Sequence, residues 1–413
     1  MTAKTYVIGA GLAGLSAAVR LAGRGRPVVL IEGAGQAGGR CRSYEDASLG
    51  MTIDNGNHLV LSGNHATYDY LRALGTEDRL AGPKDALFDF CDVRDDHRWR
   101  LRPNPGPIGW WVFANDRRVP DTQVGDYLGL LKLMRPQGEK RLRDAIRCQG
   151  PLWERLIEPL MLAALNTDAA DGSAELAAAI VRETLAVGGR AYAPRIADPS
   201  LDAAFIAPAL AYLASHGAEV RIGKRVEAIE TGPDRALGLT VGGEAIKLDD
   251  SDTVIVATPA WITPTLLPEV TAPDAFSSIV NGHFRIEAPA GAPRMVGVIG
   301  GMAQWVFAFE GRISTTISGA DAVVDMPREA MAAAIWADVA KVYGLGPELP
   351  PWQIVKERRA TFAATPDQVA KRPAARTRWR NLVLAGDWID TGLPATIEGA
   401  IRSGHKAAGI ILS

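Results

Sequence analysis

Cysteine is scarce in this chain, and the three that are present lie far apart. Cys41, Cys91 and Cys148 form no C-x-x-C pair. A disulfide framework or a zinc site needs several cysteines, or cysteines with histidines, at short spacing. The sequence therefore predicts no metal site, and the cysteine usage is typical of a reducing, cytoplasmic compartment.

The chain also lacks an excess of charge and a long hydrophobic run. Its 45 Lys and Arg residues nearly balance its 47 Asp and Glu residues, which does not indicate a nucleic-acid partner. The longest uncharged stretches, residues 253–268 and 295–309, are broken by prolines or by a Gly-Gly pair. Each is shorter than the roughly 20 apolar residues of a membrane-spanning helix. Glycines break the apolar N-terminal stretch as well, and no signal peptide is predicted.

The first 32 residues have the pattern of a strand, a glycine-rich turn, a helix and a second strand. Residues 5–8 and 27–31 are short apolar runs, and residues 12–23 have helical periodicity. The turn reads G-x-G-x-x-G, and an acid ends the second strand. Such glycines allow a tight turn and close approach to a pyrophosphate, while the acid accepts a ribose hydroxyl. The residues predicted to bind a dinucleotide are Gly9, Gly11, Gly14 and Glu32.

Two more turns follow this unit. Gly38, Gly39 and Arg40 come just beyond the acid, and residues 54–58 read Asp-Asn-Gly-Asn-His. A Gly-Gly-Arg loop can offer backbone N–H groups and a guanidinium to phosphate oxygens, although an ordinary solvent loop has the same composition. No second G-x-G-x-x-G follows a strand, so a built-in NADPH site is not predicted.

The middle of the chain alternates between helical and strand patterns. The predicted elements are helices at 139–148, 152–165, 173–187, 201–216 and 327–343, a pair of strands at 219–230, strands at 254–257 and 352–362, and an antiparallel meander at 279–318 with turns at Gly300-Gly301 and Glu310-Gly311.

Near the C-terminus an apolar strand runs into a turn and then a helix. Pro394 suits the first helical position, which leaves the N–H groups of the next residues, Ala395, Thr396 and Ile397, free for a ligand. The positive end of the helix dipole favours negative charge there. Small residues recur every four positions from Ala400 and predict close packing on another backbone. The alternative is a helix docked for packing alone.

Several stretches together resemble the superfamily of FAD-dependent amine oxidases and carotenoid desaturases. They are VIGAGLAGLSAA, IEGAGQAGGR, IDNGNH, VIVATPA and LAGDWIDTGLPATIEGAIRSG. Within this superfamily, DNGNHL and GDWIDTGLPATIEGAIRSG are most similar to the squalene-associated FAD-dependent desaturases, also called hydroxysqualene dehydroxylases. The resemblance implies FAD as cofactor, with Gly386 and Asp387 at its ribityl and pyrophosphate part, the last helix directed at the flavin, and the backbone of Val226 at the adenine. The full expected FAD set is Gly9, Gly11, Gly14, Glu32, Gly38, Gly39, Arg40, Gly56, Asn57, Val226, Gly386, Asp387, Ala395, Thr396 and Ile397.

The resemblance also implies the fold class, which is α/β. We expect a Rossmann-type, glutathione-reductase-like FAD-binding domain that is discontinuous in sequence, and a mixed α+β substrate domain built on an antiparallel sheet. The expected FAD-binding domain comprises residues 1–82, 200–260 and 380–413, and the expected substrate domain comprises residues 83–199 and 261–379.

The implied reaction is the reductive removal of a hydroxyl from hydroxysqualene, in squalene and hopanoid biosynthesis. Loss of an allylic hydroxyl leaves a delocalised cation that a hydride can quench, and an acid eases its departure. His58 is the expected acid because an imidazolium is available near neutral pH; an orienting or packing role is the alternative. The other open functions are desaturation of a carotenoid-like polyene, amine oxidation, and a lipid-carrying escort protein with a relic FAD fold. No cysteine follows Cys148, so the C-terminal cysteinyl-flavin tether of some amine oxidases is absent.

A polyisoprenoid carries no charge, so its pocket must be apolar. The candidate lining residues are Trp110, Trp111, Phe113, Leu130, Leu131, Leu133, Met134, Leu160, Met161, Trp305 and Phe307. Because the substrate dissolves in membranes, we expect a cytoplasmic protein with peripheral contact on the inner face of the cytoplasmic membrane, through residues 106–113 and 127–136. A buried loop and helix there is the alternative. The electron donor is external and, like the oligomeric state, is not identified by the sequence.

Overall fold

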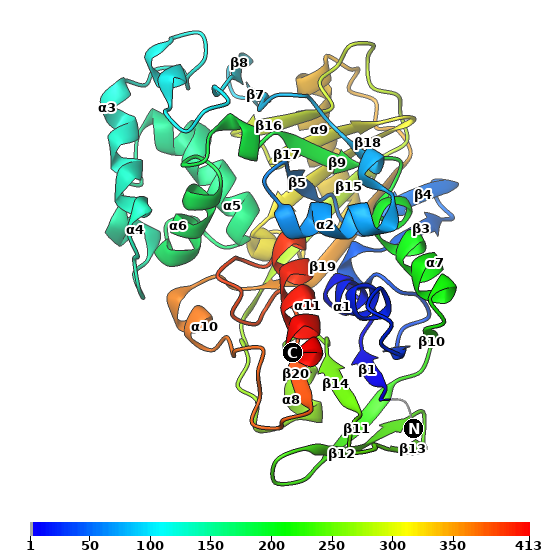
Figure 1. Ribbon diagram of the computed structural model, residues 1–413. Coiled ribbons are helices and arrows are strands. Elements are labelled where there is room, and N and C mark those ends of the chain that lie inside the picture. The colour runs from blue at the N-terminus through cyan, green and yellow to red at the C-terminus, as the bar shows by residue number, and fades with distance from the viewer. Residues whose placement is uncertain (1–2) are drawn as a thin grey trace.

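A five-stranded parallel sheet forms the lower half of the computed structural model, which describes residues 3–413 (Figure 1). Its strands in spatial order are β10 (Glu219–Ile222), β2 (Val28–Glu32), β1 (Thr5–Ile8), β14 (Thr253–Val256) and β20 (Leu382–Leu384). Every neighbouring pair is parallel. β1 and β20 are buried along their whole length, because both faces of a parallel sheet are covered, and this explains their continuous apolar sequence.

Four helices from distant parts of the chain pack together beside this sheet. α1 (Leu12–Ala22) contacts both α7 (Ala207–Ser215) and α11 (Ile397–Leu412), and α2 (His65–Leu74) also contacts α11. The closest approach is at Gly404, where an added Cβ would collide with the Ala13 carbonyl oxygen of α1. The predicted close packing of the small-residue helix is therefore confirmed.

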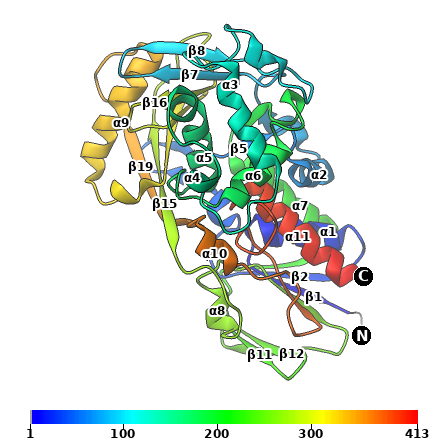
Figure 2. The same cartoon turned by 90° about the vertical axis from the view of Figure 1, so that its left-hand side faces the viewer.

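A seven-stranded sheet forms the upper half of the molecule. Its order is β19 (Trp352–Phe362), β15 (Phe276–Phe284), β18 (Arg312–Ser318), β17 (Trp305–Phe309), β16 (Met295–Ile299), β7 (Phe88–Asp92) and β8 (His97–Leu101). All pairs are antiparallel except β16 with β7. α9 (Arg328–Tyr343) lies on one side, and α5 (Glu158–Leu165) and α6 (Ala174–Glu183) lie on the other (Figure 2). The predicted helix and return strand are confirmed. The meander predicted over residues 279–318 forms only for β16, β17 and β18, because β15 pairs with β18 instead of β16.

Two predicted helices begin differently from expectation because each contains an interior proline. π-helical turns at Trp153–Ile157 and Asp202–Ile206 precede α5 and α7, whose first turns hold Pro159 and Pro208. Proline has no N–H and its ring crowds the carbonyl four residues earlier, so a wider turn replaces regular α-helix. The helix predicted over 139–148 is wrong, since only the single turn α4 (Leu142–Ala145) forms there.

The predicted pair of strands at 219–230 does not form a hairpin. β10 joins the parallel sheet, whereas β11 (Val226–Thr231) joins a separate antiparallel sheet with β12 (Ala236–Val241) and β13 (Glu244–Lys247). The chain turns between them at Gly223, where φ is +72°.

The remaining elements are β3 (Ser43–Asp46), β4 (Met51–Asp54), β5 (Leu59–Leu61), β6 (Leu80–Ala81), β9 (Pro194–Ala197), α3 (Val124–Tyr127), α8 (Thr263–Leu266) and α10 (Pro366–Ala370). The division into two discontinuous domains stays a prediction.

Candidate functional site

The glycine-rich turn lies at the carboxyl ends of β1 and β14, where ligands of parallel α/β sheets bind. Gly9 has φ +102°, and a Cβ there would lie 2.7 Å from the Ala257 carbonyl oxygen. A Cβ on Gly14 would collide with the Gly9 carbonyl oxygen. A Cβ on Gly11 would meet nothing within 4 Å. The fold itself therefore requires glycine at positions 9 and 14, while the open space beside Gly11 is available to a ligand.

Glu32 is held in a fixed position at the end of β2. Its Oε2 accepts the Ala10 N–H and its Oε1 accepts the Ala34 N–H, each at 2.7 Å. The segment that leads into β11 also lies beside it, because the Lys224 N–H donates to the Glu32 carbonyl at 2.8 Å. Two residues later comes Val226, the buried first residue of β11. Each carboxylate oxygen keeps a second lone pair that can accept a ribose hydroxyl.

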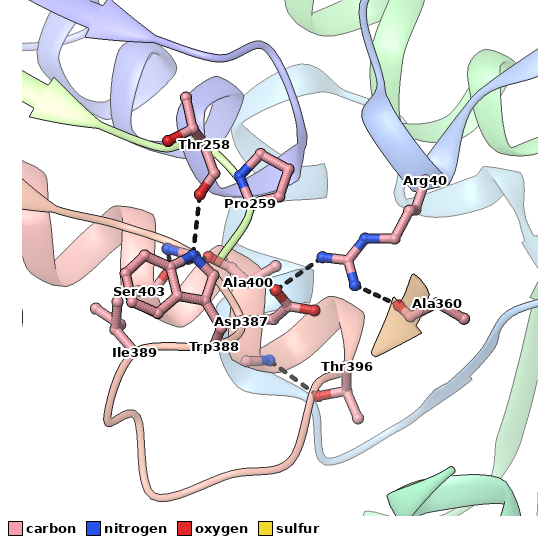
Figure 3. Close-up of polar contacts among 12 residues, drawn as sticks. Arg40, Thr258, Pro259, Ala360, Asp387, Trp388, Ile389, Thr396, Ala400 and Ser403 are labelled. Atoms are coloured by element: carbon pink, nitrogen blue, oxygen red, sulfur yellow. Dashed lines mark hydrogen bonds and ion pairs between the residues drawn. The ribbon is translucent and has the colours of Figure 1, made fainter. Parts of the chain in front are cut away.

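Arg40 and Asp387, which are 347 positions apart, form an ion pair at the centre of the site (Figure 3). The distance from Arg40 Nη2 to Asp387 Oδ1 is 2.7 Å, and the Asp387 side chain is 9% exposed. Arg40 Nη1 also donates to the Ala360 carbonyl of β19. Gly38 and Gly39, which precede the arginine, both have positive φ. Arg40 therefore links Asp387, which follows β20 of the parallel sheet, to β19 of the seven-stranded sheet, and no local sequence pattern signals the contact with Ala360.

The turn between β20 and α11 contains supporting residues that the sequence analysis missed. The Gly386 N–H donates to Ser403 Oγ at 2.8 Å, and a Cβ on Gly386 would lie 2.5 Å from Trp388 Nε1. The indole N–H of Trp388 donates to the Thr258 carbonyl at 2.9 Å (Figure 3). These contacts fix the direction in which Asp387 leaves the strand.

α11 begins at Ile397, three residues later than its sequence pattern predicts. Thr396 is the N-cap, and its Oγ accepts the Gly399 N–H at 3.0 Å, so Pro394 lies outside the helix rather than at its first position. Thr396 is favoured as the N-cap because its side chain supplies an oxygen that accepts a backbone N–H, which proline lacks. Among residues 3–413, none accepts a hydrogen bond from the N–H of Ala395, Thr396 or Ile397. Three free donors at a helix N-terminus can stabilise an anion.

The Asp54–His58 turn lies between β4 and β5 and rests on the seven-stranded sheet. Asp54 Oδ2 contacts Arg312 Nη2 at 3.3 Å. Asn57 Nδ2 donates to the Thr315 carbonyl at 3.0 Å, which fixes the orientation of the amide because a carbonyl only accepts. Asn57 Oδ1 then faces away from β18, and it is buried with no hydrogen-bond partner within the described part of the chain. Gly56 leaves room for Asn281, whose Nδ2 would lie 3.2 Å from an added Cβ.

His58 borders a small cavity that it shares with apolar residues. The other lining residues are Asp54, Asn57, Ile196, Ala197, Leu201 and Phe309. Burial lowers the pKa of His58 below its ordinary value, and the nearby Asp54 carboxylate only partly offsets this effect. The neutral imidazole is therefore favoured near pH 7. The expected role of His58 as an acid stays a prediction, and the rate it supports should rise as the pH falls.

The candidate pocket residues separate into two groups. Trp111, Leu133, Met161, Trp305 and Phe307 are buried in the core between the sheet and the helices, with Leu130 and Leu160 partly buried against it. Trp110, Phe113, Leu131 and Met134 are 42–63% exposed. These four do not line an interior pocket, because Trp111 and Leu133 take the inward positions on the same short 3₁₀ helices, Trp110–Phe113 and Leu128–Met134.

Comparisons with known proteins define the class. A family model described as flavin containing amine oxidoreductase matches residues 12–412. The chain is 52% identical to the hydroxysqualene dehydroxylase of Rhodopseudomonas palustris, covering 100% of this chain and 99% of that protein. It is 46% identical to the hydroxysqualene dehydroxylase of Zymomonas mobilis over 99% of both chains. Cyclohexylamine oxidase from Brevibacterium oxydans has a similar fold, with a TM-score of 0.73 at 15% identity over 100% of this chain and 99% of that one.

The chain therefore belongs to the flavin containing amine oxidoreductase family, and it is an FAD-dependent oxidoreductase. Its resemblance to the hydroxysqualene dehydroxylases in particular, expected from the motifs, is confirmed. The site fits FAD. The open space beside Gly11 would admit a bound dinucleotide, and the three free N–H groups at α11 and the unpartnered Asn57 Oδ1 could form hydrogen bonds with it. The contacts of individual residues with FAD stay predictions. Within residues 3–413, no cluster of three or more His, Cys, Asp or Glu side chains is arranged to hold a metal ion.

Proposed function

We propose that this chain catalyses the reductive dehydroxylation of hydroxysqualene to squalene. The observation that carries the proposal is full-length identity of about half to the hydroxysqualene dehydroxylase of Rhodopseudomonas palustris. The C–O bond of the allylic alcohol breaks, the oxygen takes up a proton and leaves as water, and the carbon takes up a hydride. When bound, FAD in its reduced form supplies the hydride.

In this reaction the residues of the chain bind and orient the cofactor and the substrate. Glu32, Arg40 and Asp387 hold the dinucleotide, and the free N–H groups at α11 stabilise negative charge on the flavin ring. His58 is the proposed proton donor to the departing oxygen. It borders the cavity that Phe309 also lines, so polar and apolar side chains meet there.

The β17 strand supplies an apolar wall for a long hydrocarbon. Phe309, Phe307 and Trp305 alternate along β17, and all three belong to the core cluster on the helical side of the sheet. At about 3.4 Å per residue this row extends about 14 Å from the His58 cavity. We infer that the polyisoprenoid lies along this row with its hydroxyl near His58.

The reaction is tested anaerobically with hydroxysqualene and protein whose flavin has been reduced. We expect the oxidised flavin spectrum to return in proportion to the squalene formed, faster at pH 6 than at pH 8 because more His58 is protonated. His58→Gln should flatten this pH dependence. Flavin that stays reduced with the alcohol, but bleaches from the oxidised form with a saturated polyene precursor, would identify a desaturase instead.

We also propose that the protein docks on a membrane surface through an exposed apolar face. Of the ten exposed large hydrophobic residues among residues 3–413, six lie within residues 108–134, and they are Ile108, Trp110, Phe113, Leu128, Leu131 and Met134. Exposed Lys132 and Arg135 lie beside them in sequence. Apolar and aromatic side chains flanked by basic residues are typical of an interfacial membrane contact. Among residues 3–413, no helix has the length and apolar character needed to span a bilayer.

Serine substitutions in this face test the docking. We expect Trp110→Ser/Phe113→Ser/Leu131→Ser to reduce co-flotation with vesicles of phosphatidylcholine and phosphatidylglycerol by about tenfold, because three large side chains no longer enter the interface. The control, Leu237→Ser/Ile262→Ser/Leu349→Ser, removes three apolar residues elsewhere that are 36–38% exposed, and it should float as the unmodified protein does. Equal loss in both variants would contradict a specific face.

A further inference from the structure

The turn that carries His58 is joined to the seven-stranded sheet by a deeply buried ion pair. Asp54 is 2% exposed and Arg312 is 3% exposed, and they meet through a single 3.3 Å contact between Oδ2 and Nη2. Asp54 ends β4 and begins the turn, whereas Arg312 begins β18, 258 positions later. Nothing in the local sequence signals this contact.

Each member of the pair is also held by other groups. Asp54 Oδ1 accepts the Ser43 hydroxyl at 2.6 Å and the Leu201 N–H at 2.9 Å. The Arg312 guanidinium lies 4.3 Å from the centre of the Phe309 ring, and its Nη1 is 3.3 Å from His283 Nδ1. Burial and the nearby guanidinium lower the pKa of His283 to about 3, so this histidine remains neutral.

A buried pair of this kind is a poor source of stability. Removing two charges from water costs about as much as their attraction returns, and well-packed apolar residues often serve equally well. The contact is also single rather than bidentate, so it lacks the geometry in which Arg–carboxylate pairs are strongest. The pair instead restrains the positions of the two side chains, because a charged group held by several partners has only one favourable orientation.

The pair touches both walls of the His58 cavity. Asp54 and Phe309 both line that cavity, and Arg312 contacts both of them. The remainder of the turn is fixed separately by Asn281, whose Nδ2 donates to the Asn55 carbonyl and whose Oδ1 accepts the Asn57 N–H, each at 3.3 Å. Arg312 therefore links the polar turn to the aromatic strand through its contacts with Asp54 and Phe309.

We propose that Arg312 and Asp54 form a positioning pair, which holds His58 and the Phe309 ring at the separation needed for the reacting carbon. The inference rests on the proposed dehydroxylation. Neither residue exchanges a proton or touches the hydride. The pair acts through the turn and through β17.

Kinetics of the flavin-loaded protein test this role. We expect Arg312→Met to lower kcat about a hundredfold, as small misplacements of reacting groups do, with KM changed by less than about threefold. Arg312→Lys, which keeps a charge near Asp54, should recover most of the rate. The double variant Asp54→Asn/Arg312→Met removes both charges, so its unfolding temperature should return toward that of the unmodified protein while kcat stays low. A double variant that regains kcat would assign the pair to stability alone.

The control variant loses a buried arginine far from the cavity. Arg235 is 8% exposed at the start of β12 and pairs with Asp250. Arg235→Met should lower the unfolding temperature without the hundredfold loss in kcat. An equal kcat loss there would show that any buried arginine matters, and would overturn the positioning role.

Hydrogen exchange separates this proposal from the proposed function. In the flavin-loaded protein, Arg312→Met should accelerate amide exchange in a peptide covering residues 51–61 but not in α9. If the unmodified protein makes no squalene, the dehydroxylation proposal fails, while this local effect still reports on the pair. Unchanged exchange in residues 51–61 would overturn the positioning role whatever the reaction is.

Discussion

Replacing Gly404 by alanine is expected to destabilise the whole protein by about 3 kcal/mol, which is a large effect for one methyl group. A Cβ at this position would collide with Ser16 Oγ and the Ala13 carbonyl oxygen, and would lie 3.0 Å from the Ala17 backbone nitrogen. Two of these three contacts are with backbone, which cannot rotate away. The free energy of unfolding from urea titration, followed by circular dichroism, measures the loss.

The same helix supplies the control. Gly409 is also within α11, but a Cβ there would meet nothing within 4 Å. Gly409→Ala should therefore increase the free energy of unfolding by about 0.5–1 kcal/mol, since alanine is the better helix former. If Gly404→Ala were as stable as Gly409→Ala, α1 and α11 would not approach as closely as the structure places them.

The nucleotide-binding unit was predictable because its signals are local. The strand, turn, helix and acid of residues 5–32 occur in a single stretch, and each step has its own steric reason. The strand at 254–257 and the apolar strand before Asp387 were predicted from short apolar runs for the same reason, and both lie in the parallel sheet with the first two strands. Patterns with periods of two or four residues also predicted α9 and β19.

The contacts that assemble the site were not predictable, because each joins residues that are far apart in sequence. Arg40 meets Asp387 and the Ala360 carbonyl, and Arg312 meets Asp54. An arginine at the start of a strand has the same local pattern whether it faces solvent or a buried carboxylate. The exposed positions of Trp110 and Phe113 were ambiguous in the same way, since apolar character does not distinguish a pocket wall from a membrane-facing surface.

Two substitutions in the glycine-rich turn are expected to reduce FAD binding for different reasons. Gly14→Ala should reduce folded, soluble protein and FAD content together, because its Cβ collides with the Gly9 carbonyl oxygen inside the fold. Gly11 has φ −73°, and an added Cβ would be unobstructed, so Gly11→Ala should fold normally. It should nevertheless bind FAD about tenfold to a hundredfold more weakly, which is a loss of about 1.4–2.8 kcal/mol in binding free energy. Isothermal titration with FAD measures this loss.

The response to added FAD distinguishes the two defects by mass action. A ligand that binds only the folded state raises the free energy of unfolding by RT ln(1 + L/Kd), where L is the free ligand concentration, and this term keeps growing after the site is filled. Without FAD, Gly11→Ala should therefore unfold at about the temperature of the unmodified protein and fall below it only when FAD is added, whereas Gly14→Ala should unfold at a lower temperature even without FAD. Gly35→Ala, in an exposed loop where a Cβ meets nothing, should match the unmodified protein in both measurements. If Gly11→Ala bound FAD with unchanged affinity, the open space beside Gly11 would not be the place where the backbone approaches the dinucleotide, and FAD would have to reach the carboxyl ends of the strands by another path.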